Sequence, residues 1–434
     1  MTRSSRRTFL KGTGTASIGA LTALAGCAGD GGNGDGGGGG DGGDSGGGGN
    51  GSGGGGGGGG GTQSLKIGHL VPLSGPFATI GEPSQKGADL AVKQVNDAGE
   101  GVELEVVHKD TESSPDTGVQ RARELVQQEE VDVLLGFASS SVAKAVSEFA
   151  ASQDVLAVAT IAQTPTITGS ECKPQTFRTA SNLDQLTTGL AQTTASLTDG
   201  SAIAGVIPDY SFGKETWAVF QEEMSAQADA SVVAETFPAF GKGDFQNEIQ
   251  AVLDAGPDIV YTSLWAGDLI TFIKQAQQYD FFEQVPEFVA GSGAITDVSR
   301  SLGSDMVEMI AVDRYFFQYP DTERNTAFVE AWREEYDEIP LNVGQETYAG
   351  VYALMNAITE SGGTSTDDLV SGLEGLEFQA PEGTKRIRAA DHQVIDENIW
   401  TGRIGPVDDL EFYGFTEMNP VPGESVTPEP NCEM

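Results

Sequence analysis

The sequence predicts an α/β protein in which two doubly wound, open-sheet lobes follow one another along the chain. Short runs rich in β-branched residues alternate with segments whose apolar residues recur at helical spacing. This alternation begins near Leu65 and restarts near Ser201. Residues 62–434 are also too many for one ordinary hydrophobic core. Repeated alternation on this scale is typical of two layers that each hold a largely parallel sheet.

The first lobe is expected to contain strands separated by amphipathic helices. Ala88, Ala91, Val92 and Val95 follow the i, i+3, i+4, i+7 spacing of a buried helix face. Residues 131–136 are almost all apolar, as expected for a parallel strand covered on both faces. The expected strands are 65–71, 102–107, 131–136 and 155–160, and the expected helices lie around 88–95, 119–126 and 142–153.

The second lobe repeats this pattern, and a third segment follows it. Tyr348, Val351, Tyr352 and Met355 again recur at helical spacing, and a β-like tail comes after them. We expect these late elements to return and complete the two lobes. The expected strands are 202–207, 231–236, 259–263, 287–290, 384–388 and 394–404, and the expected helices are 213–228, 245–253 and 268–279.

Residues 1–27 have the pattern of an export signal. Arg6 and Arg7 precede a weakly apolar stretch, 13–25, which is too short to span a membrane as a mature helix. The segment resembles a twin-arginine signal that ends in a lipobox, where cleavage would leave Cys27 as a lipid-modified N-terminus. A disordered basic leader with an incidental cysteine is the alternative.

Residues 28–63 are predicted to be a disordered tether. The run is nearly all glycine up to Gly61, so it cannot bury enough apolar surface to offset its chain entropy. Such a chain spans roughly 30 Å on average. A glycine-rich phosphate-binding loop is excluded because no strand or helix pattern flanks the run.

The charge is strongly acidic. The chain carries 64 acidic and 24 basic side chains, a formal charge of −40, and loss of the signal would leave −44. This balance disfavours nucleic-acid binding, which needs a basic surface. No stretch has the spacing of an EF-hand loop, so calcium binding is not indicated. The composition resembles that of proteins from salt-loving archaea, where salt screens self-repulsion.

Two cysteines lie in the body of the chain. Outside the cell Cys172 and Cys432 could form one disulfide that fixes the tail, and two free buried thiols are the alternative. With only three scattered histidines, they do not make a zinc site, and we expect no metal and no cofactor. The histidines are His69, His108 and His392.

Six short motifs, in order, resemble the leucine/isoleucine/valine-binding family of type I periplasmic binding proteins. They are residues 66–76, 87–92, 95–99, 177–180, 209–214 and 255–260, and the resemblance covers about 64–405. It implies two lobes that close on a ligand like a hinge. It also implies three crossovers, which we place near 181–184, 311–314 and 375–380. Lobe 1 would then comprise 64–182 plus 313–376, and lobe 2 would comprise 183–312 plus 377–434.

The resemblance implies ligand-binding residues in the loops that follow strands of the first lobe. Ser139 and Ser140 stand before a helix, where hydroxyls and free amides could cradle a carboxylate, although plain N-capping is the alternative. Ile161 and Gln163 match a loop that contacts the ligand's α-substituents, and an ordinary loop is the alternative. Two further positions would flank the ligand side chain: Ile80 and Phe77.

In the second lobe the resemblance points to aromatic residues. Phe212 and Trp265 match aromatics that close over the ligand, and Tyr210 is a third candidate. Aromatic rings add contact area at small entropic cost, and their faces attract ammonium groups. Ordinary core packing is the alternative for these side chains.

One position departs from the family's pattern. Gly293 stands where amino-acid binders carry an acid that pairs with the ligand's ammonium. A desolvated ammonium without an anion is costly, so either another acid replaces it or the ligand has no α-ammonium. Amides, urea and organic acids therefore join amino acids as candidate ligands. The candidate replacement acids are Asp209, Glu82 and Asp268.

The resemblance implies that the protein captures a small polar solute, foremost a branched-chain or other amino acid, and delivers it to an ABC-type permease. The sequence contains no nucleophile elbow, Walker loop, HExxH zinc motif or cysteine–histidine pair, so we expect no enzyme. We expect a monomer, exported by the twin-arginine route and lipid-anchored on the outer face of the cell membrane. A sensor built on the same clamp stays open as an alternative.

Overall fold

The computed structural model describes residues 62–74 and 77–434. The predicted signal, nearly all of the predicted tether and the candidate anchor Cys27 lie outside these residues. Within the described part of the chain, no helix is long and apolar enough to cross a membrane. The folded region forms two large sheets and one small sheet.

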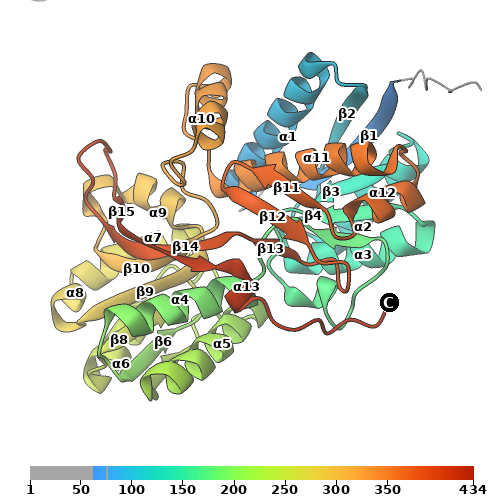
Figure 1. Cartoon of the computed structure of the whole chain (residues 1–434). Coiled ribbons are helices and arrows are strands. Elements are labelled where there is room, and N and C mark those ends of the chain that lie inside the picture. Colours follow the sequence, from blue (N-terminus) through green and yellow to red (C-terminus); the bar gives the residue numbers. More distant parts are fainter. Residues whose placement is uncertain (1–61, 75–76) are drawn as a thin grey trace, which may run out of the picture. The chain divides into compact units, whose positions relative to one another are not determined.

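The first large sheet is wholly parallel, with the strand order β2-β1-β3-β4-β5. Its strands alternate between two buried clusters, because successive side chains point to opposite faces. Helices α1 (Ala78–Ala98), α11 (Asn342–Ser361) and α12 (Thr366–Leu373) cover one face, and α2 (Pro115–Gln127) and α3 (Ser140–Gln153) cover the other (Figure 1). We call this assembly lobe 1. The strands are β1 (Gln63–Val71), β2 (Val102–Asp110), β3 (Val133–Gly136), β4 (Leu156–Ala159) and β5 (Thr176–Arg178).

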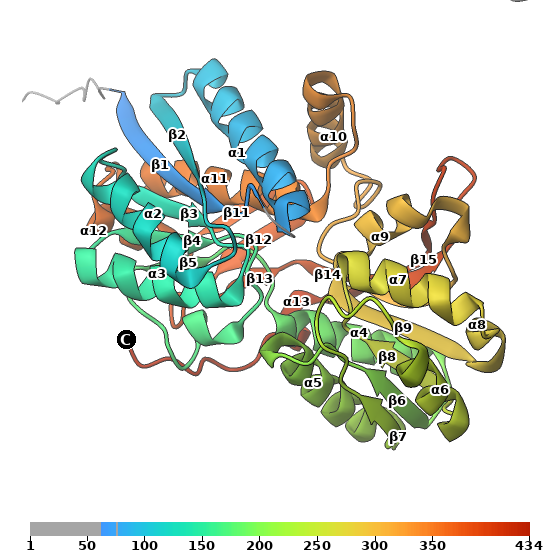
Figure 2. The ribbon, with the colours of Figure 1, turned by 180° about the vertical axis from the view of Figure 1, so that it is seen from behind.

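The second large sheet is mixed, with the order β15-β14-β10-β9-β8-β6-β7. Helices α6 (Gln246–Ala255), α7 (Ala266–Gln277) and α9 (Ile295–Leu302) pack on one face, and α4 (Leu183–Leu197) and α5 (Ser211–Ala228) pack on the other (Figure 2). A short helix, α8 (Phe281–Gln284), follows α7. We call this assembly lobe 2. The strands are β6 (Ala202–Val206), β7 (Ser231–Thr236), β8 (Ile259–Thr262), β9 (Glu287–Gly293), β10 (Met309–Asp313), β14 (Asn398–Gly405) and β15 (Gly414–Pro422).

The remaining elements lie along the connections between the sheets. The small antiparallel sheet holds β11 (Glu377–Ala380), β12 (Gly383–Ile387) and β13 (Val394–Asp396). Helix α10 (Glu323–Tyr336) follows β10, and α13 (Gly423–Val426) follows β15. The chain leaves the first sheet after Arg178, leaves the second after Asp313 and rejoins it at Asn398. The third of these passages comes later than the expected 375–380, because residues 377–396 form their own sheet.

A buried cluster of charges joins these connections. Lys385 on β12 is fully buried, and its Nζ lies 2.7 Å from carboxylate oxygens of both Glu382 and Asp396 and 3.2 Å from Glu346 on α11. It also donates a hydrogen bond to the carbonyl oxygen of Thr179, directly after β5. Burial raises the pKa of Glu346 to about 8, although the charge of Lys385 opposes this shift. Lys385 therefore ties the first passage, through its hydrogen bond to Thr179, to the third passage, where it pairs with Glu382 and Asp396.

The C-terminal residues return from lobe 2 to lobe 1. Cys432 forms a disulfide with Cys172, which follows β4, and the two residues are 260 positions apart in sequence. Between α13 and this disulfide, Thr427 accepts a hydrogen bond from Gln185 on α4, and the Pro428 carbonyl accepts one from Arg388. We call residues 427–432 the C-terminal strap.

Candidate functional site

The candidate site lies at the carboxyl ends of the parallel strands. In open α/β sheets, ligands bind where the loops after these strand ends gather. In lobe 1 these loops carry Ser139 after β3 and Ile161 and Gln163 after β4, and in lobe 2 they carry Tyr210 after β6 and Trp265 after β8. Side-chain contacts join the loops of the two lobes directly, as described below.

Ser139 and Ser140 lie at the start of α3, as predicted. No side chain caps this helix, and the Ser139 hydroxyl is 2.9 Å from that of Ser141. Both Ser139 and Ser140 are half-buried. The alternative of plain N-capping thus finds no support, because the first amides of α3 are left to another acceptor. A carboxylate is the acceptor that a helix N-terminus favours most.

Two buried arginines hold the loop that contains Ile161 and Gln163. Arg314, directly after β10, donates from Nη1 to the Ile161 carbonyl oxygen at 2.8 Å. Arg178, at the end of β5, donates to the carbonyl oxygens of Ala162 and Thr164. Burial lowers the pKa of Arg178 to about 9, and the charge of Arg314 acts in the same direction. The loop is thereby positioned by main-chain contacts that do not depend on its own side chains.

Gln163 forms a bridge between the lobes. Its Nε2 donates to the carbonyl oxygen of Ser292 on β9 at 3.1 Å. Next to this contact, Asn342 at the start of α11 donates to the Gly293 carbonyl oxygen at 2.7 Å. The Ser292 hydroxyl is buried without a hydrogen-bond partner among the described residues. It is therefore a further polar group beside the predicted loop.

The backbone explains why no acid stands at position 293. Gly293 has a φ of +71°, in the left-handed region that side chains strain to adopt. An added Cβ would also lie 3.2 Å from Leu186 Cδ1 and 3.5 Å from Gln163 Nε2. A carboxylate cannot be accommodated here without rearrangement, so any partner for a ligand ammonium must come from elsewhere.

The three candidate replacement acids already have partners. Asp209 pairs with Lys214 at 2.7 Å, and Glu82 pairs with Lys86 at 2.9 Å. Asp268, at the start of α7, accepts a hydrogen bond from the Gly241 amide at 2.8 Å. They therefore have structural roles of their own.

Asp184 is an acid that the sequence reasoning missed. It is half-buried in the first turn of α4, and the preceding amide, that of Leu183, donates to the Gln163 carbonyl oxygen at 3.0 Å. Burial raises the pKa of Asp184, although the charge of Arg178 opposes the shift. A half-buried carboxylate beside the predicted loop is suited to pair with a ligand cation. No sequence signal distinguishes it from the other acids that begin helices.

Five aromatic rings come together, four of them predicted. Trp265 stacks on Phe77 of lobe 1 with ring centroids 5.0 Å apart, and its indole Nε1 donates to the Tyr210 hydroxyl at 2.8 Å. Phe212 stacks on Tyr210 at 5.9 Å. The fifth ring, Phe240, stacks on both Trp265 and Phe77, at 5.3 and 5.8 Å. We call these residues the aromatic cluster, and it joins the two lobes.

Ile80 lies in the first turn of α1. It packs against a small apolar group formed by Val71, Ile161 and Val343. Ile80 therefore packs against Ile161 and supports the loop that follows β4.

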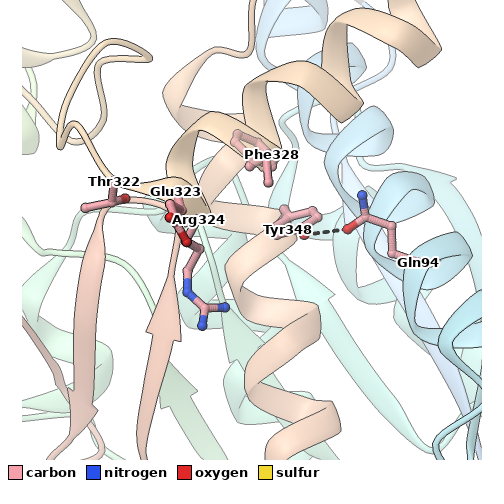
Figure 3. Close-up of a pocket in the computed structure, with 7 residues that line it drawn as sticks. Gln94, Thr322, Glu323, Arg324, Phe328 and Tyr348 are labelled. Atoms are coloured by element: carbon pink, nitrogen blue, oxygen red, sulfur yellow. Dashed lines mark hydrogen bonds between the residues drawn. The ribbon is translucent and has the colours of Figure 1, made fainter.

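A hollow lies elsewhere, between α1, α10 and α11 (Figure 3). It has a volume of about 660 Å³ and contains none of the predicted ligand residues. Tyr348 donates a hydrogen bond to Gln94 across it at 2.6 Å. Its residues are Gln94, Thr322, Glu323, Arg324, Ala327, Phe328 and Tyr348.

Two of the histidines are neighbours, which the sequence reasoning did not anticipate. His69 and His108 on adjacent strands approach within 2.8 Å between their Nδ1 atoms, and His108 Nε2 lies 2.9 Å from Asp89. Burial lowers the pKa of His69 well below its usual value. Among residues 62–74 and 77–434, no group of three metal-ligating side chains is suited to hold a metal ion.

Comparison with known proteins agrees with this architecture. The sequence profile of the periplasmic binding protein family matches residues 64–405. Leu/Ile/Val-binding protein homolog 8 of Brucella abortus is 27% identical over 337 residues, which cover 74% of this chain and 81% of that protein. Leu/Ile/Val-binding protein homolog 7 of Brucella suis is 25% identical, covering 73% and 82%.

Solved structures share the fold. A solute-binding protein of an ABC transporter from Rhodopseudomonas palustris, in complex with 3,4-dihydroxybenzoic acid, superposes with a TM-score of 0.75 at 24% identity, covering 83% of this chain and 98% of that one. An ABC-type branched-chain amino acid transporter structure from the same species superposes with a TM-score of 0.72 at 21% identity, covering 85% and 100%. The profile match spans most of the described residues, and the two-sheet architecture accords with it. The chain therefore belongs to the periplasmic binding protein family.

Proposed function

We propose that this protein captures a small carboxylate solute between its lobes and delivers it to an ABC-type permease. The observation that carries the proposal is the meeting of strand-end loops from both sheets. The loops of the two sheets meet where Gln163 donates to Ser292 and where Trp265 stacks on Phe77, and the first sheet also presents the uncapped start of α3. The uncapped start of α3 would hold a carboxylate, and the aromatic cluster would pack on an apolar group of the solute. Closure of the lobes would then exclude water from the solute.

We favour an aromatic carboxylate as the solute. The aromatic cluster offers flat apolar faces, and ring–ring contacts add about 0.5–1.5 kcal/mol beyond burial. Such a ligand carries no ammonium, so it needs no acid at Gly293. The relative crystallised with 3,4-dihydroxybenzoic acid and another crystallised with benzoate support this choice.

An α-amino acid is the second candidate. Asp184 favours it, because a half-buried carboxylate beside Gln163 could pair with an ammonium. The Leu/Ile/Val-binding names of the curated relatives support this class as well. In either case, we propose a monomeric binding protein without catalytic activity.

Calorimetry on residues 62–434 tests the proposal. We expect binding of benzoate-type acids or of branched-chain amino acids in high salt, and Ser140→Ala should weaken it about tenfold through loss of a bond to the carboxylate. Asp184→Asn separates the two classes, since it should abolish amino-acid binding and spare aromatic acids. Unchanged affinity in Ser140→Ala, beside an unchanged Ser152→Ala control, would remove the Ser140 hydroxyl from the site.

We also propose export by the twin-arginine route and anchoring through Cys27, which supports the placement of a solute-binding body outside the cell. The acidic composition, −40 overall, suits a high-salt surrounding. Cys27→Ser should move the mature protein from the membrane fraction to the medium. Arg6→Lys with Arg7→Lys should instead leave a precursor inside the cell. Membrane association that survives Cys27→Ser would contradict the anchor.

A further inference from the structure

The loop between β7 and α6 carries Phe240, an aromatic ring that contacts both lobes. Phe240 is 42% exposed, yet it stacks on Phe77 of lobe 1 and on Trp265 of lobe 2. It also meets Tyr210 edge-on, with centroids 5.9 Å apart. Three stacked rings from three separate segments thus span the two lobes.

Helix α7 holds this loop in place. Asp268 accepts a hydrogen bond from the Gly241 amide at 2.8 Å, and its side chain is buried. Seven residues later, Gln275 accepts from the Phe245 amide at 2.7 Å and donates to the Gly243 carbonyl at 3.0 Å. Residues seven apart lie on the same helix face, so one face of α7 forms hydrogen bonds with the loop at Gly241 and again at Gly243 and Phe245.

Trp265 is the N-cap residue of the same helix. Asp268 therefore fixes the loop relative to the residue on which Phe240 stacks. Gly241 and Gly243 both have left-handed φ values, +74° and +72°, which let the loop turn back at this point. The position of Phe240 is determined by the loop's main chain rather than by burial of its own side chain.

We propose that Phe240, positioned by Asp268, is the clasp that holds lobe 1 through Phe77, both in the free protein and when it is closed on its solute. The clasp controls how long the solute stays bound. This inference rests on the proposed function, because it concerns closure of the same site. Asp268 is a positioning residue here and does not contact the solute.

Tryptophan fluorescence tests the clasp without a solute. The chain has four tryptophans, and Trp217, Trp332 and Trp400 are 3%, 0% and 5% exposed, whereas Trp265 is half-buried. Acrylamide quenching therefore reports mainly on Trp265. Phe240→Ala and Phe77→Ala should both increase quenching. The matched control is Phe237→Ala, because Phe237 is 39% exposed on the same loop and has no stacked ring among the described residues.

Benzoate dissociation measured by stopped flow tests the effect on binding. Phe240→Ala should raise the benzoate dissociation rate roughly three- to tenfold, because Phe240 no longer stacks on Phe77 of lobe 1. Asp268→Ala should match Phe240→Ala. Asp268→Asn should behave like wild type, because the asparagine amide oxygen still accepts the hydrogen bond from the Gly241 amide. If Asp268 instead paired with a ligand ammonium, Asp268→Asn would remove the negative charge of that pair and weaken binding.

The outcomes separate the two proposals. Wild-type protein that binds neither benzoate nor an amino acid would contradict the proposed function. The quenching of Trp265 in the free protein would still show whether Phe240 forms the clasp. Equal quenching in wild type, Phe240→Ala and Phe237→Ala would overturn the clasp. Binding with a dissociation rate unaffected by Phe240→Ala would overturn it too and leave the proposed function standing.

Discussion

Replacing Lys385 with methionine should lower the free energy of unfolding by about 3–5 kcal/mol, because it leaves buried carboxylates without their cation. Lys385 is fully buried and contacts Glu346, Glu382 and Asp396 within 3.2 Å. Urea unfolding at neutral pH and fixed high salt measures the change. The substitution should also loosen the passages between the lobes, because the Thr179 carbonyl loses the hydrogen bond that Lys385 donates.

Lys93→Met is the matched control for this experiment. Lys93 forms an ion pair with Glu335, but its side chain is 55% exposed. Exposed pairs contribute only about 0–1 kcal/mol, so this variant should unfold almost like wild type. A similar small change in Lys385→Met would show that the cluster accommodates the loss by taking up protons or water.

The same cluster predicts a pH dependence. Burial raises the pKa of Glu346 to about 8, above its usual 4.5. The folded protein thus keeps a proton that the unfolded chain loses, and stability from this group falls as pH rises through 8. Wild type should therefore lose stability relative to Glu346→Gln between pH 5 and 9. A constant difference between wild type and Glu346→Gln over that range would contradict the shift.

Breaking the Cys172–Cys432 disulfide is the second large effect. Cys432→Ser should lower the free energy of unfolding by about 4 kcal/mol, because the disulfide closes a loop of 260 residues and restricts the unfolded chain. Thermal unfolding with and without a reducing agent measures it. Reduction should destabilise wild type and leave Cys432→Ser unchanged. Equal midpoints for oxidised and reduced wild type would show that the strap contributes nothing.

Strands β3 and β8 could be predicted because their residues are largely apolar on both faces. The expected 259–263 and 131–136 correspond to β8 and β3, all of whose residues are buried. Strand β15 was missed because its middle residues are polar and only partly buried. Helix α10 was missed for a similar reason, since few of its residues are buried. The spacing of apolar residues predicts a helix or strand only where one face of that element packs against the hydrophobic core.

The candidate site was predictable where a residue follows a strand, and less so where it depends on another segment. Ser139, Ile161 and Trp265 lie at strand ends, so their loops could be located from the pattern. Phe240 belongs to a loop whose course depends on hydrogen bonds to α7. Likewise, nothing in the sequence shows that Arg178 is buried, since arginine is usually exposed.

The C-terminal strap has a consequence for how far the protein can open. It starts from α13 beside the second sheet and ends at Cys172 in lobe 1, so it is a covalent link in addition to the three passages of the chain. Six residues reach at most about 20 Å when extended. Any swing of the lobes that pulls these anchor points apart must stop at that reach for as long as the disulfide is intact, so the redox state of Cys172 and Cys432 sets a mechanical limit on the motion.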